Sequence, residues 1–366
     1  MKPSPSPPLR SQVTSRPVDV RAIESYLADR TAADEFSGAI RIDQAGQPLL
    51  RAAYGWASPT WGVAADPRTR FDTASVTKLF TAVATLQQVD AGEFALGTSA
   101  IDYLELRNTR ISAEVTVYHL LTHTSGIADD ADEEAGEEYS DLFVDRPNYV
   151  IRETADFLPQ FADKPPNFAP GAGCRYCNCS YVLLGLMVER ATGLPYRDYV
   201  RQRIFGPAGM TRSGFFAMDV VEPDVAEGLT PIVSSAGTRT GWRRSIYSYP
   251  PIGSPDGGAH ATVDDLAAFH VALSQGRLLS TESTTAVLTP HEDYRPMARG
   301  LHRTGYGFEF EVVEGQVRSY WKEGHNTGVS GILQHYPRSD VTVAVLSNLA
   351  EGTWAPMEFI DAQVPA

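Results

Sequence analysis

Apolar and polar residues recur along the chain with two different periods. Between Val20 and Leu27, apolar residues at helical spacing would form one face of a first helix over 18–30. The same period predicts further helices within 75–92, 111–121, 181–191, 197–204 and 262–275. Gly92 and Gly193 close two of these segments, as is typical of helix C-termini. The middle of the chain is therefore predicted to be mostly helical.

A period of two residues predicts β-strands at both ends of the chain. Segments 37–43 and 49–55 flank a short turn, which is typical of a β-hairpin. Beyond Gly305 the pattern predicts strands at 306–313, 317–322, 328–336 and 341–347. We expect both ends to build one sheet. Residues 19–75 and 295–366 would form an α/β sheet domain, with a mostly helical domain, 76–294, inserted between them.

Three further segments show neither period. Residues 1–18 are rich in proline and serine and are predicted to be a disordered tail. Residues 218–255 are rich in Gly, Pro and Ser, and we expect a long excursion over the surface. Residues 129–141 contain eight carboxylates, which predicts a solvated surface loop. An alternative is an acidic lip that attracts cationic or amine-bearing substrates to a nearby site.

Composition narrows the classes of partner. The chain has 366 residues, a net charge of −14 and a pI near 5.0, which argues against binding to nucleic acid or to an anionic membrane surface. We find neither a secretory h-region nor a transmembrane segment, so a cytoplasmic protein is expected. Cys174, Cys177 and Cys179 lie close together, but no fourth ligand stands nearby. We expect no metal or organic cofactor, and the oligomeric state is left open.

Ser75 and Lys78 are the first candidates for chemistry. At the start of a helix this spacing puts both side chains on one face, and an amine beside a hydroxyl can make serine a nucleophile. Alone the pair is a weak signal, because such residues are usually solvated. Two later groups strengthen it, Tyr176-Cys177-Asn178 before a predicted helix and Lys322-Glu323-Gly324-His325 between two strands. Taken singly, Tyr176 could be a packed aromatic residue, Asn178 a turn residue and Lys322 a charge on an edge strand.

With these three boxes in order, the chain resembles the serine β-lactamase and penicillin-binding protein superfamily. It is most like the branch of class C β-lactamases, D-stereospecific peptidases and family VIII esterases. The resemblance runs from about Ser37 to Asn348 and includes 120–126, 182–185 and 257–258. It implies an α/β (α+β) fold of the β-lactamase/transpeptidase type. An antiparallel sheet would be flanked by helices, with the site in the cleft between the two domains.

The resemblance also implies roles. Ser75 would attack a carbonyl carbon, with either Lys78 or Tyr176 as the base. A second cation, Lys322, would depress the pKa of Lys78 and stabilise a Tyr176 phenolate. Asn178 would hydrogen-bond Lys78 or a substrate amide. The backbone N–H groups of Ser75 and His325, the residue after Gly324, would bind the oxyanion.

The third box departs from the family pattern. Glu323 stands where lactamases and carboxypeptidases have Thr or Ser, and a glutamate facing the site would repel a substrate carboxylate. In another register His325-Asn326-Thr327 is the box, and His325 takes the role given to Lys322.

We therefore expect acyl transfer through an acyl-Ser75 intermediate, most simply hydrolysis of a small neutral or cationic ester or amide. The alternatives are a transacylase that uses an amine or alcohol acceptor, a β-lactamase or DD-carboxypeptidase, and a non-catalytic binding or sensor protein.

Overall fold

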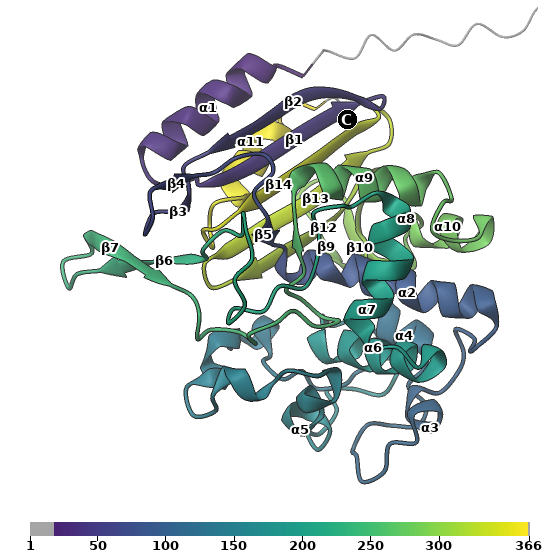
Figure 1. Ribbon diagram of the computed structural model, residues 1–366. Helices are drawn as coiled ribbons and strands as arrows, with labels where there is room; N and C mark the ends of the chain where they lie inside the picture. The colour runs from purple at the N-terminus through teal and green to yellow at the C-terminus, as the bar shows by residue number, and fades with distance from the viewer. Residues whose placement is uncertain (1–17, 365–366) are drawn as a thin grey trace, which may run out of the picture.

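The computed structural model describes residues 18–364 (Figure 1). The tail predicted at 1–18 lies outside this range except for Val18. That residue is 7% exposed and packs in a hydrophobic cluster with the first helix. At this one position the prediction of a disordered tail is therefore wrong. Within the described residues, no helix combines the length and apolar character needed to cross a bilayer.

An eight-stranded antiparallel sheet forms the centre of the molecule. Its order is β2-β1-β14-β13-β12-β11-β10-β9. The strands are β1 (Gly38–Gln44), β2 (Gln47–Tyr54), β9 (Glu292–Pro296), β10 (Leu301–Thr304), β11 (Glu309–Val313), β12 (Gln316–Asn326), β13 (Val329–Tyr336) and β14 (Val341–Ser347). Strand β14 pairs with β1, so strands from the two ends of the chain meet in one sheet, as predicted. The predicted boundaries between the two domains stay a prediction.

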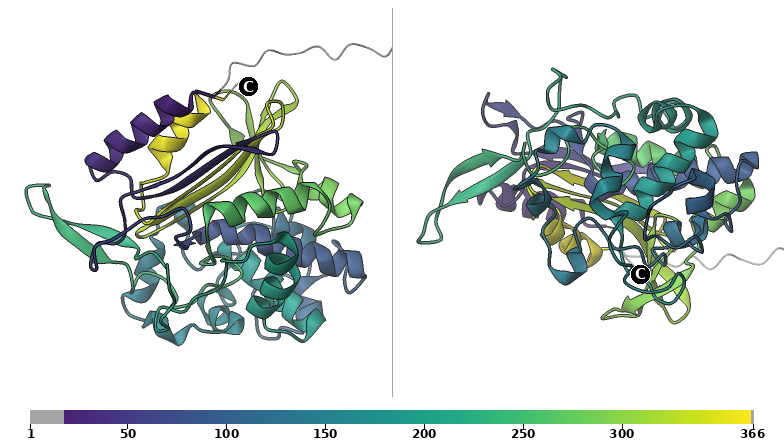
Figure 2. Two further views of the ribbon diagram at one scale, coloured as in Figure 1. Left: turned by 45° about the horizontal axis from the view of Figure 1, so that its top comes forward. Right: turned by 90° about the horizontal axis from the view of Figure 1, so that it is seen from below.

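Two helices cover one face of the sheet (Figure 2). They are α1 (Val20–Ala32) and α11 (Trp354–Asp361), and Tyr26 stacks on Phe359 between them with ring centroids 4.3 Å apart. The alternating burial of the strands explains this layer. Ile40, Ile42 and Val343 face these helices, whereas Ala39 and Ala344 belong to the cluster on the other face.

The opposite face packs against the helical part of the chain (Figures 1 and 2). These helices are α2 (Lys78–Ala91), α3 (Ala100–Leu104), α4 (Val117–Leu121), α5 (Leu158–Phe161), α6 (Asn178–Thr192), α7 (Tyr196–Val200), α8 (Gly206–Ala208), α9 (Val263–Ser274) and α10 (Thr281–Val287). Short 3₁₀ helices are η1 (Ala74–Thr77), η2 (Glu133–Ala135), η3 (Tyr139–Phe143), η4 (Asn148–Val150) and η5 (Thr154–Phe157), and η6 (Arg201–Phe205) is a short π-helix. Gly92 and Gly193 adopt the left-handed conformation after α2 and α6, as expected for C-caps.

Small two-stranded elements complete the fold. They are β3 (Trp56–Ser58) with β4 (Val63–Ala64), β5 (Phe71–Asp72) with β8 (His260–Ala261), and β6 (Leu229–Val233) with β7 (Arg239–Arg244). The β6–β7 hairpin projects from the body of the molecule (Figure 1). The prediction of an irregular excursion over 218–255 is therefore incomplete, because Gly and Pro obscure the alternation in this stretch.

The acidic run also differs from the prediction. Asp129 and Asp130 are 6% and 2% exposed, whereas Glu137 and Glu138 are exposed. The acidic run therefore begins inside the protein and reaches solvent only further along. The prediction of a solvated loop holds only for its later part.

Candidate active site

Ser75 lies in η1, between strand β5 and helix α2. The preceding residue, Ala74, has a φ of 41°, which is strained for a residue with a Cβ. Two hydrogen bonds hold this conformation. The Ala74 amide donates to Asp72 Oδ1 at 2.7 Å, and the Gly258 amide donates to the Ala74 carbonyl at 3.2 Å. The backbone around Ser75 is therefore fixed by neighbours from both sides.

Lys78 is fully buried one turn after Ser75. Its Nζ lies 2.9 Å from Ser75 Oγ and donates to Asn178 Oδ1 at 2.7 Å and to the Asp256 carbonyl at 2.6 Å. Burial lowers the pKa of Lys78, the Asp256 carboxylate opposes this effect and Lys322 adds to it, and the resulting pKa is about 8. A neutral amine in contact with the Ser75 hydroxyl is thus accessible near neutral pH.

Tyr176 approaches Ser75 from the other side. Its hydroxyl donates to Ser75 Oγ at 2.8 Å, and its ring centroid lies 5.0 Å from Lys78 Nζ and 4.7 Å from Lys322 Nζ. Burial nevertheless raises the pKa of Tyr176 well above its ordinary value, and Glu133 adds to this effect. The phenol form of Tyr176 is therefore favoured despite the two lysines.

Lys322 is 1% exposed and forms an ion pair with Glu309 at 2.7 Å. The other oxygen of Glu309 lies 2.8 Å from His302 Nε2. Burial alone would raise the pKa of Glu309, but Lys322 and His302 hold it below its ordinary range. Sequence reasoning missed Glu309 and His302, because neither stands in a motif.

The geometry distinguishes the two registers of the third box. Lys322 lies beside Tyr176, whereas the His325 ring lies 6.0 Å from Trp354, and its Nε2 lies 3.5 Å from Glu351. His325 also lines the cavity that contains Ser75. The position next to Tyr176 is therefore occupied by Lys322, with His325 at the rim.

Glu323 does not line this cavity, contrary to the expectation. Strand β12 continues to Asn326, so side chains at 322 and 323 point to opposite faces. Glu323 pairs with Ile332, which faces α1 and α11. The predicted repulsion of a substrate carboxylate by Glu323 thus has no basis in the structure.

Gly324 brings strand β12 against the nucleophile. A Cβ at this position would lie 2.2 Å from the Thr73 carbonyl oxygen and 2.8 Å from the Ser75 nitrogen. Only glycine allows this approach of the two backbones. The oxyanion roles of the Ser75 and His325 amides stay a prediction.

Asn178 is held by a carboxylate cap at the start of α6. Asp129 accepts the Asn178 amide at 2.8 Å and the Cys179 amide at 2.9 Å through its two oxygens. Asp129 was predicted only as part of the acidic run. Its cap sets the position from which the Asn178 side chain contacts Lys78.

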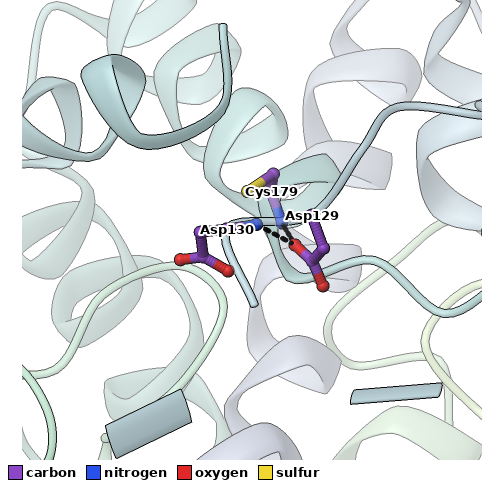
Figure 3. A group of neighbouring side chains, drawn as sticks. All are labelled: Asp129, Asp130 and Cys179. Atoms are coloured by element: carbon purple, nitrogen blue, oxygen red, sulfur yellow. Dashed lines mark hydrogen bonds between the residues drawn. The ribbon is translucent and has the colours of Figure 1, made fainter. Parts of the chain in front are cut away.

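Asp129, Asp130 and Cys179 form a buried group whose potential ligand atoms lie within 4.8 Å of one another (Figure 3). Burial raises the pKa values of Asp130 and Cys179 well above their ordinary range, which favours the protonated forms. Metal ligands must be deprotonated, and the Asp129 oxygens already accept backbone amides. The group fits a helix cap better than a metal site.

A cavity of about 430 Å³ opens in front of Ser75. Its lining comes from β3 and the turn after it, the acidic run, the segment 216–260 and the end of β12. The lining includes Trp61, Glu133, Tyr139, Asn178, Phe216, Met218, Val221, Tyr249 and His325. The nucleophile therefore faces a space for a small molecule, with both apolar and polar side chains in its walls.

Comparisons with known proteins identify the family of the chain. The Beta-lactamase family model matches residues 23–360. Penicillin-binding protein 4 of Amycolatopsis lactamdurans is 29% identical over 301 residues, which cover 78% of this chain and 74% of that protein. Esterase EstB of Burkholderia gladioli is 36% identical over 182 residues, or 48% of this chain and 45% of the esterase.

Solved structures show the same fold. A penicillin-binding protein from Bacillus halodurans is similar with a TM-score of 0.85 and 34% identity, covering 93% of this chain and 99% of that one. The D-amino acid amidase of Ochrobactrum anthropi SV3 has a TM-score of 0.76 at 21% identity, covering 94% and 98% of the two chains, a likeness of fold alone. The chain that carries Ser75, Lys78 and Tyr176 in one hydrogen-bonded group therefore belongs to the Beta-lactamase family of serine hydrolases.

Proposed function

We propose that the protein hydrolyses small esters or amides through an acyl-enzyme intermediate on Ser75. The observation that carries the proposal is the position of Ser75 Oγ, 2.9 Å from Lys78 Nζ and 2.8 Å from Tyr176 Oη. A nucleophile in contact with both a base and an acid is the arrangement that acyl transfer needs.

In the first half-reaction, Ser75 Oγ forms a bond to the substrate carbonyl carbon and passes its proton to neutral Lys78. The tetrahedral intermediate then collapses as the bond to the leaving alcohol or amine breaks. Tyr176 gives its phenolic proton to that leaving group and is reprotonated from Lys78. The products are a Ser75 ester and a free alcohol or amine.

In the second half-reaction, water takes the place of the leaving group. Its oxygen bonds to the acyl carbon while its proton goes to the same base, and the Ser75–acyl bond breaks. Ser75 recovers a proton and a carboxylic acid is released. The environment of Lys78 favours this chemistry, since burial brings its pKa to about 8.

Intact-mass measurement tests the proposal. The purified protein is exposed to a panel of small esters, amides and β-lactams, quenched with acid and weighed. We expect an adduct equal to the acyl group with at least one ester or amide. No adduct should form on Ser75→Ala, whose hydrolysis should fall by about 10⁴-fold or more. Equal hydrolysis by the wild type and Ser75→Ala would overturn the proposal, as would inertness of the folded wild type toward the whole panel and toward a reactive fluorophosphonate.

A further inference from the structure

Ion pairs and a hydrogen bond join the segment around Glu133 to the loop that carries Tyr176. Arg175 forms ion pairs with Asp132 at 2.5 Å and with Glu134 at 3.5 Å. Glu134 also accepts the Tyr176 amide at 2.9 Å. The two carboxylates that flank Glu133 thus bind protein groups, and they fix the backbone of Glu133 relative to the site.

Glu133 itself is exposed and lines the cavity. Its Oε1 accepts a hydrogen bond from Asn178 Nδ2 at 3.3 Å, and Asn178 Oδ1 in turn accepts from Lys78. Among residues 18–364, no lysine, arginine or histidine side chain lies within ion-pair distance of Glu133, although its two neighbours have such a partner. One carboxylate of the acidic run is thus left available to a ligand, close to the nucleophile.

Part of the remaining cavity wall suits an apolar group. Trp61 and Val221 line it while 80% and 99% exposed, and Phe216 and Met218 add further apolar surface. Large apolar side chains this exposed around a cavity mark a binding surface. These side chains and Ser75 line the same cavity, so a ligand in it can contact both.

We propose that Glu133 binds a positively charged amine on the acyl part of the substrate, so that the substrate is an ester or amide of an apolar amino acid or a similar amine-bearing acid. This inference rests on the proposed function, because it concerns the same acyl-Ser75 site. Ser75 and Glu133 line the same cavity and are linked by hydrogen bonds through Lys78 and Asn178, so that one small substrate can contact both.

A purely electrostatic role for Glu133 makes a different prediction. Glu133 also favours the ammonium form of Lys78, as Asp256 and Asp129 do, against the effect of Lys322. If this were its only role, Glu133→Gln would change the rates with all substrates alike and would move the pH profile. Recognition of an amine affects only substrates that carry one.

The test compares p-nitroanilides that differ only in the amine. The amine-bearing substrates are the two enantiomers of phenylalanine p-nitroanilide, and the amine-free substrate is 3-phenylpropionyl p-nitroanilide. We expect Glu133→Gln to lower kcat/KM by about 10- to 100-fold for at least one phenylalanine enantiomer, mainly through KM, as for loss of a hydrogen bond to a charged group. The rate with the 3-phenylpropionyl substrate should stay within about twofold. Glu138→Gln removes the same charge from the exposed part of the run and should leave both rates unchanged.

A second readout does not depend on turnover. Labelling of Ser75 by a fluorophosphonate should be slowed by phenylalaninamide but not by 3-phenylpropionamide, and Glu133→Gln should abolish this difference. Equal effects on amine-bearing and amine-free compounds, or none on either, would overturn the inference. Labelling of Ser75 in such a result would leave the proposed function standing, whereas absence of labelling would count against the proposed function itself.

Discussion

Lys78 donates a hydrogen bond from Nζ to the carbonyl oxygen of Asp256 at 2.6 Å, and the carboxyl group of the same Asp256 is buried near the ammonium. Ser254 Oγ donates to Asp256 Oδ1 at 2.6 Å and fixes the carboxylate. One residue therefore holds the Lys78 amine through its backbone and stabilises the protonated amine through its side chain.

This relationship predicts the pH dependence of activity. Lys78 must be neutral to accept the Ser75 proton, so kcat/KM should rise with pH around a midpoint near the Lys78 pKa of about 8. The Asp256 carboxylate raises that pKa. Asp256→Asn should therefore move the midpoint to lower pH, by about one unit for the loss of a neighbouring opposite charge. The measurement is the pH profile of kcat/KM with a neutral ester.

Asp198→Asn is the control for the overall change in charge, because the Asp198 side chain is 46% exposed and pairs with Arg201 on the surface. Its profile should match that of the wild type. A midpoint for Asp256→Asn that stays in place or rises would show that Asp256 does not tune Lys78.

Burial of Lys78 should also make stability depend on pH. Its pKa falls from 10.5 to about 8 on folding, so the folded state binds fewer protons than the unfolded state between these values. The resulting loss of unfolding free energy is fully present below pH 8 and disappears as the pH rises toward 10.5. Relative to Lys78→Met, the wild type should gain about 2 kcal/mol of unfolding free energy from pH 7 to pH 9.5. Urea unfolding at several pH values measures this difference, and parallel curves for the two proteins would contradict it.

The nucleophile pair could be predicted from the sequence because its spacing is local. Ser75 and Lys78 are separated by one helical turn, and a helix keeps such residues together wherever it packs. Tyr176 and Asn178 were found because they stand in a second short motif. Each motif could be found in isolation, but their meeting at Ser75 depends on tertiary packing.

The partners of the lysines could not be predicted in the same way. Glu309 and Asp256 are ordinary acidic residues outside any motif. Glu309 meets Lys322 through the pairing of β11 with β12, 13 residues apart in sequence, and Asp256 meets Lys78 across 178 residues through the packing of the 254–258 turn. The side chain of Glu323 was expected to face the site because the predicted strand ended at 322. The real strand runs on to Asn326, and its alternation turns Glu323 to the other face.

The two strands at one end of the sheet, β10 and the edge strand β9, were missed for a related reason. Strand β9 is mostly exposed and β10 is short, so neither shows a clear apolar alternation. Their pairing is set by neighbouring strands rather than by their own sequence.

The buried pair of Lys322 and Glu309 leads to a prediction about stability. Glu309→Gln would leave the Lys322 ammonium buried without its counter-ion, and loss of one partner of a buried pair costs about 3–5 kcal/mol. Unfolding by urea at pH 7 measures this cost. Asp293→Asn is the control, since it breaks an ion pair with Arg303 in which Asp293 is 69% exposed, and the expected loss is below about 1 kcal/mol.

A double variant separates the charge from the packing. Lys322→Met with Glu309→Gln removes both charges, and it should recover part of the stability lost in Glu309→Gln alone. If Glu309→Gln alone were no less stable than Asp293→Asn, solvent or another residue would have to compensate the buried charge of Lys322.

The contact between Gly324 and Ser75 gives the most local prediction. A Cβ at 324 would meet the Thr73 carbonyl oxygen at 2.2 Å and the Ser75 nitrogen at 2.8 Å, both of them backbone atoms that cannot rotate away. Gly324→Ala must therefore push β12 and η1 apart and move Ser75 relative to Tyr176. A displacement of about 1 Å at a reacting group can cost about 100-fold in rate, so kcat should fall by at least that factor. The control is Gly97→Ala, because a Cβ at 97 meets no atom within 4 Å. Steady-state kinetics, with circular dichroism to confirm folding, would show the difference, and a folded Gly324→Ala variant with wild-type kcat would refute the role of this contact in positioning the nucleophile.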